Sequence, residues 1–119
     1  MQKEIAVAEP IISVSGLRGI VGETLTPETA VRYVAAFAST LPPGKVVLAG
    51  DGRASGAMLA EAVAATLHAA GRSTIEAGVA PTPTVGVLVR QQGAVGGVQI
   101  TASHNPAEYN GLKLFSAEG

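Results

Sequence analysis

The segment from Thr101 to Lys113 places a hydroxyl, an imidazole, a carboxamide and an amine within a few positions of one another, directly after an apolar run. Ser103 follows a predicted strand, in a loop whose backbone freedom is restricted by Pro106. Its hydroxyl could therefore be held outward as a nucleophile or as the carrier of a phosphoryl group. The alternative is an ordinary turn serine, because serines are common in loops. The residue types alone leave both interpretations open.

Three neighbours of Ser103 add groups that could take part in chemistry. His104 could exchange a proton near neutral pH or bind a phosphate, or its ring could fix the local backbone. Asn105 could hold the loop through bonds between its side chain and the backbone, its commoner role before proline. Lys113 could bring an ammonium to a phosphate or act as an acid or base, although an exposed strand lysine is the ordinary case. The pair Asn110-Gly111 predicts a tight turn that returns Lys113 towards Ser103.

Two further polar loops follow predicted strands. Arg18 lies between Gly16 and Gly19, where small neighbours let a guanidinium clamp an anion, unless it is simply a surface arginine. Asp51 and Arg53 are close enough in sequence to form an ion pair that fixes their loop, a structural role. Asp51 is the only aspartate in the chain, so a magnesium site built from several carboxylates would need ligands from outside it.

The elements that must position these groups alternate between strand and helix patterns. Short apolar runs predict strands at 10–15, 45–50, 73–79, 97–101 and 111–116, and the glycine-rich segment 16–23 is predicted to be a loop. Helices are predicted to begin after the cap residues Thr26 and Ser55 and at Thr82, and to end near residue 41, at Gly71 and near Gln91. This order indicates a three-layer α/β/α domain with a mainly parallel, mixed sheet and binding loops beyond the carboxyl ends of its strands.

Composition narrows the class of protein. The 119 residues suit one domain, and a hydrophobic fraction of 47% with only 3% aromatics predicts a core of Ala, Val, Leu and Ile. The formal charge is −1 with no run of either sign, which argues against nucleic-acid and membrane partners. The chain has no cysteine and no segment of membrane-spanning length. We expect a cytoplasmic α/β domain.

The hexapeptide TASHNP at 101–106 resembles the active-site serine loop of the α-D-phosphohexomutases, the phosphoglucomutase and phosphomannomutase family. Four more segments resemble family segments in family order: SGLRG at 15–19, GDGRASG at 50–56, GVAPTP at 78–83 and EYNGLK at 108–113. Gly50 departs from the pattern, because many members carry an arginine there. The resemblance covers most of the chain, which is similar to the first domain of these four-domain enzymes.

The resemblance implies that Ser103 carries the phosphoryl group, gives it to a hexose monophosphate and recovers it from the other end of a bisphosphate intermediate. It also implies that the phosphate on Ser103 contributes an oxygen to Mg²⁺, and that glucose 1,6-bisphosphate activates the enzyme. By position, His104 and Lys113 match residues implicated in binding and proton transfer, and Arg18 matches an active-site arginine. Asn105 joins Arg18 as a candidate phosphate-binding residue. Asp51, Arg53, Pro106 and Asn110-Gly111 are expected to shape the loops.

Residues 1–119 would then be domain I of a longer enzyme, and the isolated segment is expected to be inactive; a natural short protein is the alternative. Tyr109-Asn110 favours glucose or mannose phosphates over glucosamine phosphate.

A second hypothesis is a catalytically silent module that binds phosphosugars or a protein partner through the same loops. A third, an aspartate-nucleophile phosphatase, would need Asp51 in an acidic pair that the sequence lacks.

Overall fold

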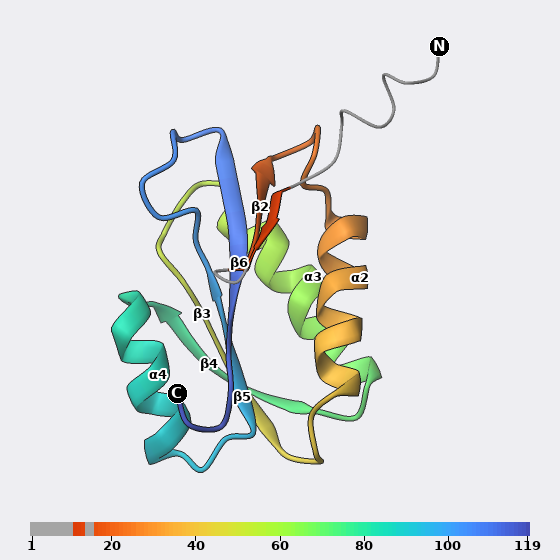
Figure 1. Ribbon diagram of the computed structural model, residues 1–119, viewed down its shortest axis with the longest axis vertical. Helices are drawn as coiled ribbons and strands as arrows, with labels where there is room; N and C mark the ends of the chain where they lie inside the picture. Colours follow the sequence, from red (N-terminus) through yellow and green to blue (C-terminus); the bar gives the residue numbers. More distant parts are fainter. Residues whose placement is uncertain (1–10, 14–15) are drawn as a thin grey trace.

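A computed structural model describes residues 11–13 and 16–119 of the chain as one mixed sheet with helices on both faces (Figure 1). The strands are β1 (Ile11–Ser13), β2 (Gly16–Ile20), β3 (Lys45–Gly50), β4 (Ser73–Val79), β5 (Gly96–Ile100) and β6 (Tyr109–Phe115), and the helices are α2 (Pro27–Ser39), α3 (Gly56–Ala69) and α4 (Thr82–Gln91). The strand order is β1-β2-β6-β5-β3-β4. Of these six strands, β2, β3, β4 and β5 run in one direction and β1 and β6 in the other. The predicted α/β fold is confirmed.

The sheet separates two apolar clusters. Helices α2 and α3 cover one face and α4 covers the other (Figure 1). In β3, Val46 and Leu48 point into the first cluster and Val47 and Ala49 into the second, because successive side chains of a strand face opposite sides. This explains why the strand is a continuous apolar run, as the sequence analysis predicted.

Local signals set the helix boundaries. The Thr26 hydroxyl accepts a hydrogen bond from the backbone N–H of Thr29 at 3.2 Å, which confirms Thr26 as the cap of α2. Gly71 adopts a φ of 81° just after α3, where a left-handed residue ends a helix. The predicted cap of α3 differs: Ser55 occupies the cap position, but its side chain makes no capping bond. Its hydroxyl accepts instead from Asn110.

Two glycine-rich segments predicted to be irregular are strands. Part of the predicted loop at 16–23 forms β2, which pairs with β6. Asn110-Gly111 is not a tight turn, because both residues lie inside β6 opposite Gly19 and Arg18. A Cβ on Gly111 would meet the backbone oxygens of Leu17 and Thr101, so this glycine allows close strand approach rather than a turn. Of the predicted strand 10–15, residues 11–13 form β1 and the others lie outside the described residues.

Candidate functional site

The loop that joins β5 to β6, residues 101–108, is called the serine loop below. It lies beside the loop that joins β3 to α3, because β3 and β5 are parallel neighbours whose carboxyl ends meet at one edge of the sheet. The backbone N–H of Asp51 donates to the carbonyl of Ile100 at 3.0 Å and ties the two loops together at their roots. Candidate residues from both loops therefore share one region, as expected for an open α/β sheet.

Ser103 is exposed and is the one described residue other than glycine with a positive φ, 57°. Its backbone N–H donates to the hydroxyl of Thr101 at 3.0 Å, and this hydroxyl donates to a carboxylate oxygen of Asp51 at 2.7 Å. Thr101 is buried, whereas the neighbouring His104 is exposed. The backbone N–H of Ser103 is thus held by a buried residue, while Ser103 and His104 themselves are exposed to solvent.

Arg53 holds the serine loop from its other side. Its Nε lies 3.3 Å from Asp51 Oδ2, in an ion pair whose arginine side chain is only 17% exposed. Its two terminal nitrogens donate at 2.8–3.1 Å to four backbone carbonyls, those of Ser103, Asn105, Pro106 and Tyr109. Sequence spacing suggested only the local pair with Asp51. The contacts with these four carbonyls span 50 to 56 residues and have no local signature.

Arg18 also reaches the serine loop. It lies in β2, and its Nη1 donates to the side-chain oxygen of Asn105 at 3.3 Å. The backbone N–H of Asn105 donates to the carbonyl of Ala102 at 3.1 Å, which closes a turn around Ser103. The structure therefore brings Arg18, Ser103, His104 and Asn105 into one region.

Lys113 is placed differently. It lies within β6 opposite Gln99, with no hydrogen bond to the serine loop among the described residues. Cross-strand partners share a face, and the Gln99 amide donates to the carbonyl of Ala80 just before α4, so Lys113 is on the α4 side of the sheet. The predicted turn at Asn110-Gly111 does not return Lys113 to Ser103, because the chain continues straight through that pair.

Asn110 has a structural role, as expected, but through its buried side chain rather than through a turn. Its side chain is fully buried, donates to the Ser55 hydroxyl at 2.9 Å and accepts from the Gly111 N–H at 2.9 Å. It therefore joins the start of β6 to the start of α3. Because it points into the protein, its amide is not placed to distinguish one sugar from another.

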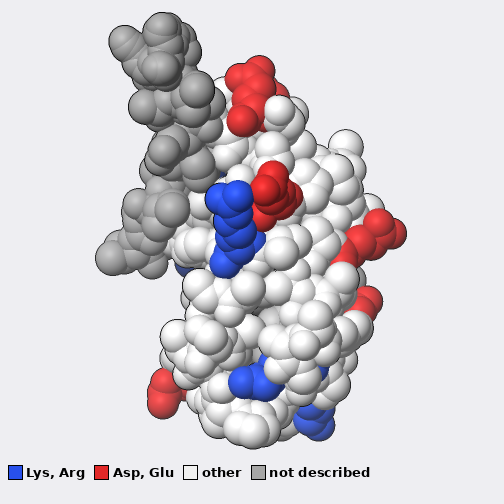
Figure 2. Space-filling view, turned by 90° about the vertical axis from the view of Figure 1, so that its right-hand side faces the viewer, with Lys and Arg blue, Asp and Glu red and all other residues white. Residues whose placement is uncertain are grey.

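Charge is spread thinly over the protein. Lys, Arg, Asp and Glu are scattered over the face seen in Figure 2, with no patch of one sign among the residues coloured there.

Within residues 11–13 and 16–119 there is no group of three or more His, Cys, Asp or Glu that could hold a metal ion. The carboxylate of Asp51 pairs with Arg53 and accepts a hydrogen bond from Thr101. No helix in this part of the chain is long and apolar enough to cross a membrane.

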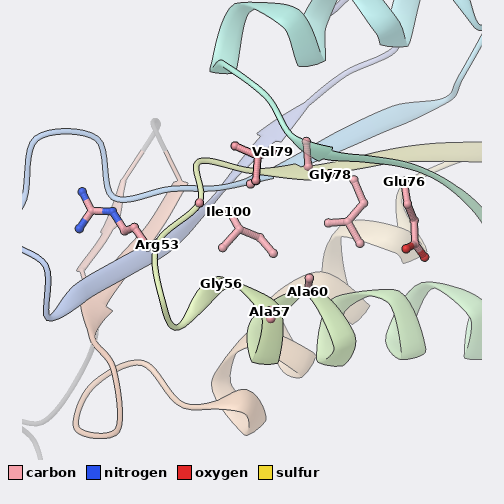
Figure 3. A pocket seen from close by; sticks show the side chains of 12 residues that line it. Arg53, Gly56, Ala57, Ala60, Glu76, Gly78, Val79 and Ile100 are labelled. Carbon is pink, nitrogen blue, oxygen red and sulfur yellow. The ribbon is translucent and has the colours of Figure 1, made fainter.

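An apolar hollow of about 530 Å³ lies between the first turns of α3 and the ends of β3 and β4 (Figure 3). Ala57, Ala60, Val79 and Ile100 line it, and Arg53 stands at its rim. The side chain of Arg53 points away from the other labelled residues in Figure 3. Ser103, His104 and Lys113 do not line the hollow, whereas Arg53 both lines it and holds the serine loop.

The sequence of the chain is similar to that of a known protein family. Residues 10–119 match a family described as "Phosphoglucomutase/phosphomannomutase, alpha/beta/alpha domain I". The chain is 47% identical over 105 residues to a "Probable phosphoglucosamine mutase" of Pyrococcus horikoshii, covering 88% of this chain and 23% of that protein. It is 43% identical over 116 residues to a "Phosphoglucosamine mutase" of Prochlorococcus marinus, covering 97% of this chain and 25% of that protein.

A solved structure has the same fold. The crystal structure of a "putative phosphomannomutase" from Thermus thermophilus superposes with a TM-score of 0.85 at 32% identity, over 92% of this chain and 26% of that one. This chain thus spans about a quarter of the length of the proteins it matches.

Proposed function

The chain belongs to the phosphoglucomutase/phosphomannomutase family, and from that premise we propose that it is domain I of a longer phosphohexomutase and carries the phosphoserine, Ser103. The observation that best supports this function is the exposed hydroxyl of Ser103 on a backbone fixed by Thr101 and Arg53. Phosphoryl transfer depends mainly on positioning and on electrostatic stabilisation, and both need such a rigid support.

In the proposed reaction, a hydroxyl of a hexose monophosphate attacks the phosphorus on Ser103. The bond from phosphorus to the serine oxygen breaks as the bond to the sugar oxygen forms, and the sugar hydroxyl gives up its proton. The phosphoryl group at the other end of the bisphosphate is then transferred to Ser103: its bond to the sugar oxygen breaks as the bond to the serine oxygen forms. The serine hydroxyl gives up its proton and the sugar oxygen takes one up, which leaves the isomeric sugar monophosphate. His104 is the candidate nearest to Ser103 for moving the proton, and Arg18 and Asn105 are candidates for binding phosphate.

Lys113 has less support as a catalytic residue in this proposal, because β6 places it on the α4 side of the sheet.

Mg²⁺ would neutralise charge on the migrating phosphoryl group, and the phosphate on Ser103 would contribute one oxygen to it. The remaining ligands would come from outside the chain, since its only aspartate is held by Arg53 and Thr101. We likewise assign the sugar-binding residues and the other domains to polypeptide beyond these 119 residues.

We propose glucosamine phosphate as the preferred substrate. The curated relatives at 43% and 47% identity bear the name phosphoglucosamine mutase, whereas Tyr109-Asn110 indicated glucose or mannose phosphates in the sequence analysis. Asn110 is fully buried, which argues against direct contact between its side chain and a sugar. A panel of glucosamine, glucose and mannose phosphates would measure the preference as a ratio of kcat/KM values.

The test of the function is phosphosite mapping on the longest polypeptide that the gene encodes, before and after incubation with glucose 1,6-bisphosphate and Mg²⁺. We expect a phosphoryl group on Ser103 and loss of mutase turnover in Ser103→Ala. Ser39→Ala is the control, because Ser39 is an exposed serine at the end of α2. Phosphosugar binding without phosphorylation of Ser103 would instead identify a catalytically silent binding module.

A further inference from the structure

All the hydrogen-bond donors of the Arg53 guanidinium are used within the protein. A guanidinium carries five N–H donors: one on Nε and two on each terminal nitrogen. In this structure Nε donates to Asp51, Nη1 to the carbonyls of Pro106 and Tyr109, and Nη2 to those of Ser103 and Asn105. An arginine that binds a phosphate substrate must keep at least one donor for it. Arg53 has none left, so it is not placed to touch the substrate.

The same contacts control the conformation of the serine loop. Four carbonyl oxygens converge on one cation, and without that cation their partial negative charges would face one another. Two of these carbonyls belong to Ser103 and Asn105, which flank His104. The loop also holds Ser103 at a positive φ of 57°, which is sterically unfavourable for a residue with a Cβ. A strained backbone conformation of this kind persists only when contacts with surrounding residues hold it in place.

We propose that Arg53 is the positioning residue for phosphoryl transfer at Ser103: by capping three carbonyls of the serine loop and that of Tyr109 at the start of β6, it fixes the direction of the Ser103 hydroxyl without contacting the sugar phosphate. Asp51 completes the device, because one carboxylate binds the guanidinium and also accepts from Thr101, whose hydroxyl holds the Ser103 N–H. This inference rests on the proposed function for the reaction that Ser103 performs, whereas the clamp itself is independent of it.

Arg72 provides a matched control. It too caps backbone carbonyls, donating to those of Ala38, Leu41 and Ala70, but these lie at the ends of α2 and α3 rather than in the serine loop. Removal of either guanidinium leaves carbonyl groups without partners and is expected to lower stability. Only Arg53 is expected to alter the chemistry of each folded molecule.

The experiment compares Arg53→Ala, Arg53→Lys and Arg72→Ala in the full-length protein. Turnover of glucosamine phosphate, hydrogen exchange of residues 101–109 and the melting temperature are measured for each. For Arg53→Ala we expect a kcat about 100-fold lower with KM nearly unchanged, because misplacing a reacting group by about 1 Å has an effect of that order. The serine loop should also exchange faster. Arg72→Ala should melt earlier with an unchanged kcat and unchanged exchange in the loop.

Several results would overturn the proposal. A raised KM with unchanged kcat would make Arg53 a substrate-binding residue, and an unchanged kcat per folded molecule would make it structural only. If Arg53→Ala does not fold, Arg53→Lys decides: it keeps the charge but offers three donors, so wild-type kcat and wild-type exchange in this variant contradict the clamp. Absence of phosphate on Ser103 in the wild-type protein would reject the proposed function as well, whereas a phosphorylated wild type with unaffected Arg53 variants rejects only the inference.

Discussion

At the scale of single residues, the left-handed backbone of Ser103 separates the needs of stability from those of chemistry. Glycine adopts a φ of 57° without the steric cost that a Cβ imposes. We predict that Ser103→Gly unfolds at a higher urea concentration than Ser103→Ala, with a free energy of unfolding larger by about 1 kcal/mol. Both variants lack the hydroxyl and should lack mutase activity. Equal stability of the two would show that the strain is relaxed in solution.

Tyr33 gives a prediction about pH. Burial raises the pKa of its phenol above the ordinary value of 10.0, because the charged form is poorly solvated there. Above that ordinary value the unfolded chain releases the proton first, so the folded state holds more protons and loses stability as pH rises. Urea midpoints measured from pH 9 to pH 11.5 should fall less steeply in Tyr33→Phe than in the wild type. If the urea midpoints of the two proteins fall equally steeply with pH, burial does not raise the pKa of Tyr33.

At the scale of elements, sequence predicted well what local chemistry decides. The cap Thr26, the terminating Gly71 and the apolar run of β3 act within a few residues, and the structure has them as expected. The predictions of a loop at 16–23 and a turn at Asn110-Gly111 were wrong, because glycine occurs both in turns and where two strands approach closely. Only the position of the partner strand distinguishes these two uses. In the site, the loop chemistry around Ser103 could be predicted, but not the clamp of Arg53, whose partners lie more than 49 residues away.

Gly111 tests the role of close strand approach. A methyl group there would meet backbone atoms of Leu17 and Thr101, which cannot move without shifting β2 or the serine loop. We predict that Gly111→Ala lowers the free energy of unfolding by at least about 1–3 kcal/mol, the usual effect of overpacking. Gly56→Ala is the matched control, because nothing lies within 4 Å of the added Cβ at the first residue of α3. It should be neutral or slightly stabilising in the same urea titration.

At the scale of the whole molecule, the sheet of the described residues ends in strand β4, which pairs with β3 alone among them. The unpaired side of an edge strand offers N–H and C=O groups to other chains. At its end Val79 is 76% exposed beside the apolar hollow of Figure 3, and a net charge of −1 gives little repulsion between copies. Charged or capped edges are the usual protection against such pairing, and β4 has only Glu76 as a charged residue.

We therefore predict that the 119-residue chain by itself associates at high concentration through the β4 edge. Val79→Lys should weaken this association about tenfold or more, since burial of a valine side chain contributes about 1.5 kcal/mol or more. Sedimentation velocity over a concentration series measures it. Val87→Lys is the control, because Val87 is an exposed valine on α4 rather than on the sheet edge. A wild-type chain that sediments as a monomer at every concentration would show that the charge of Glu76 and the twist of the edge suffice to keep β4 unpaired.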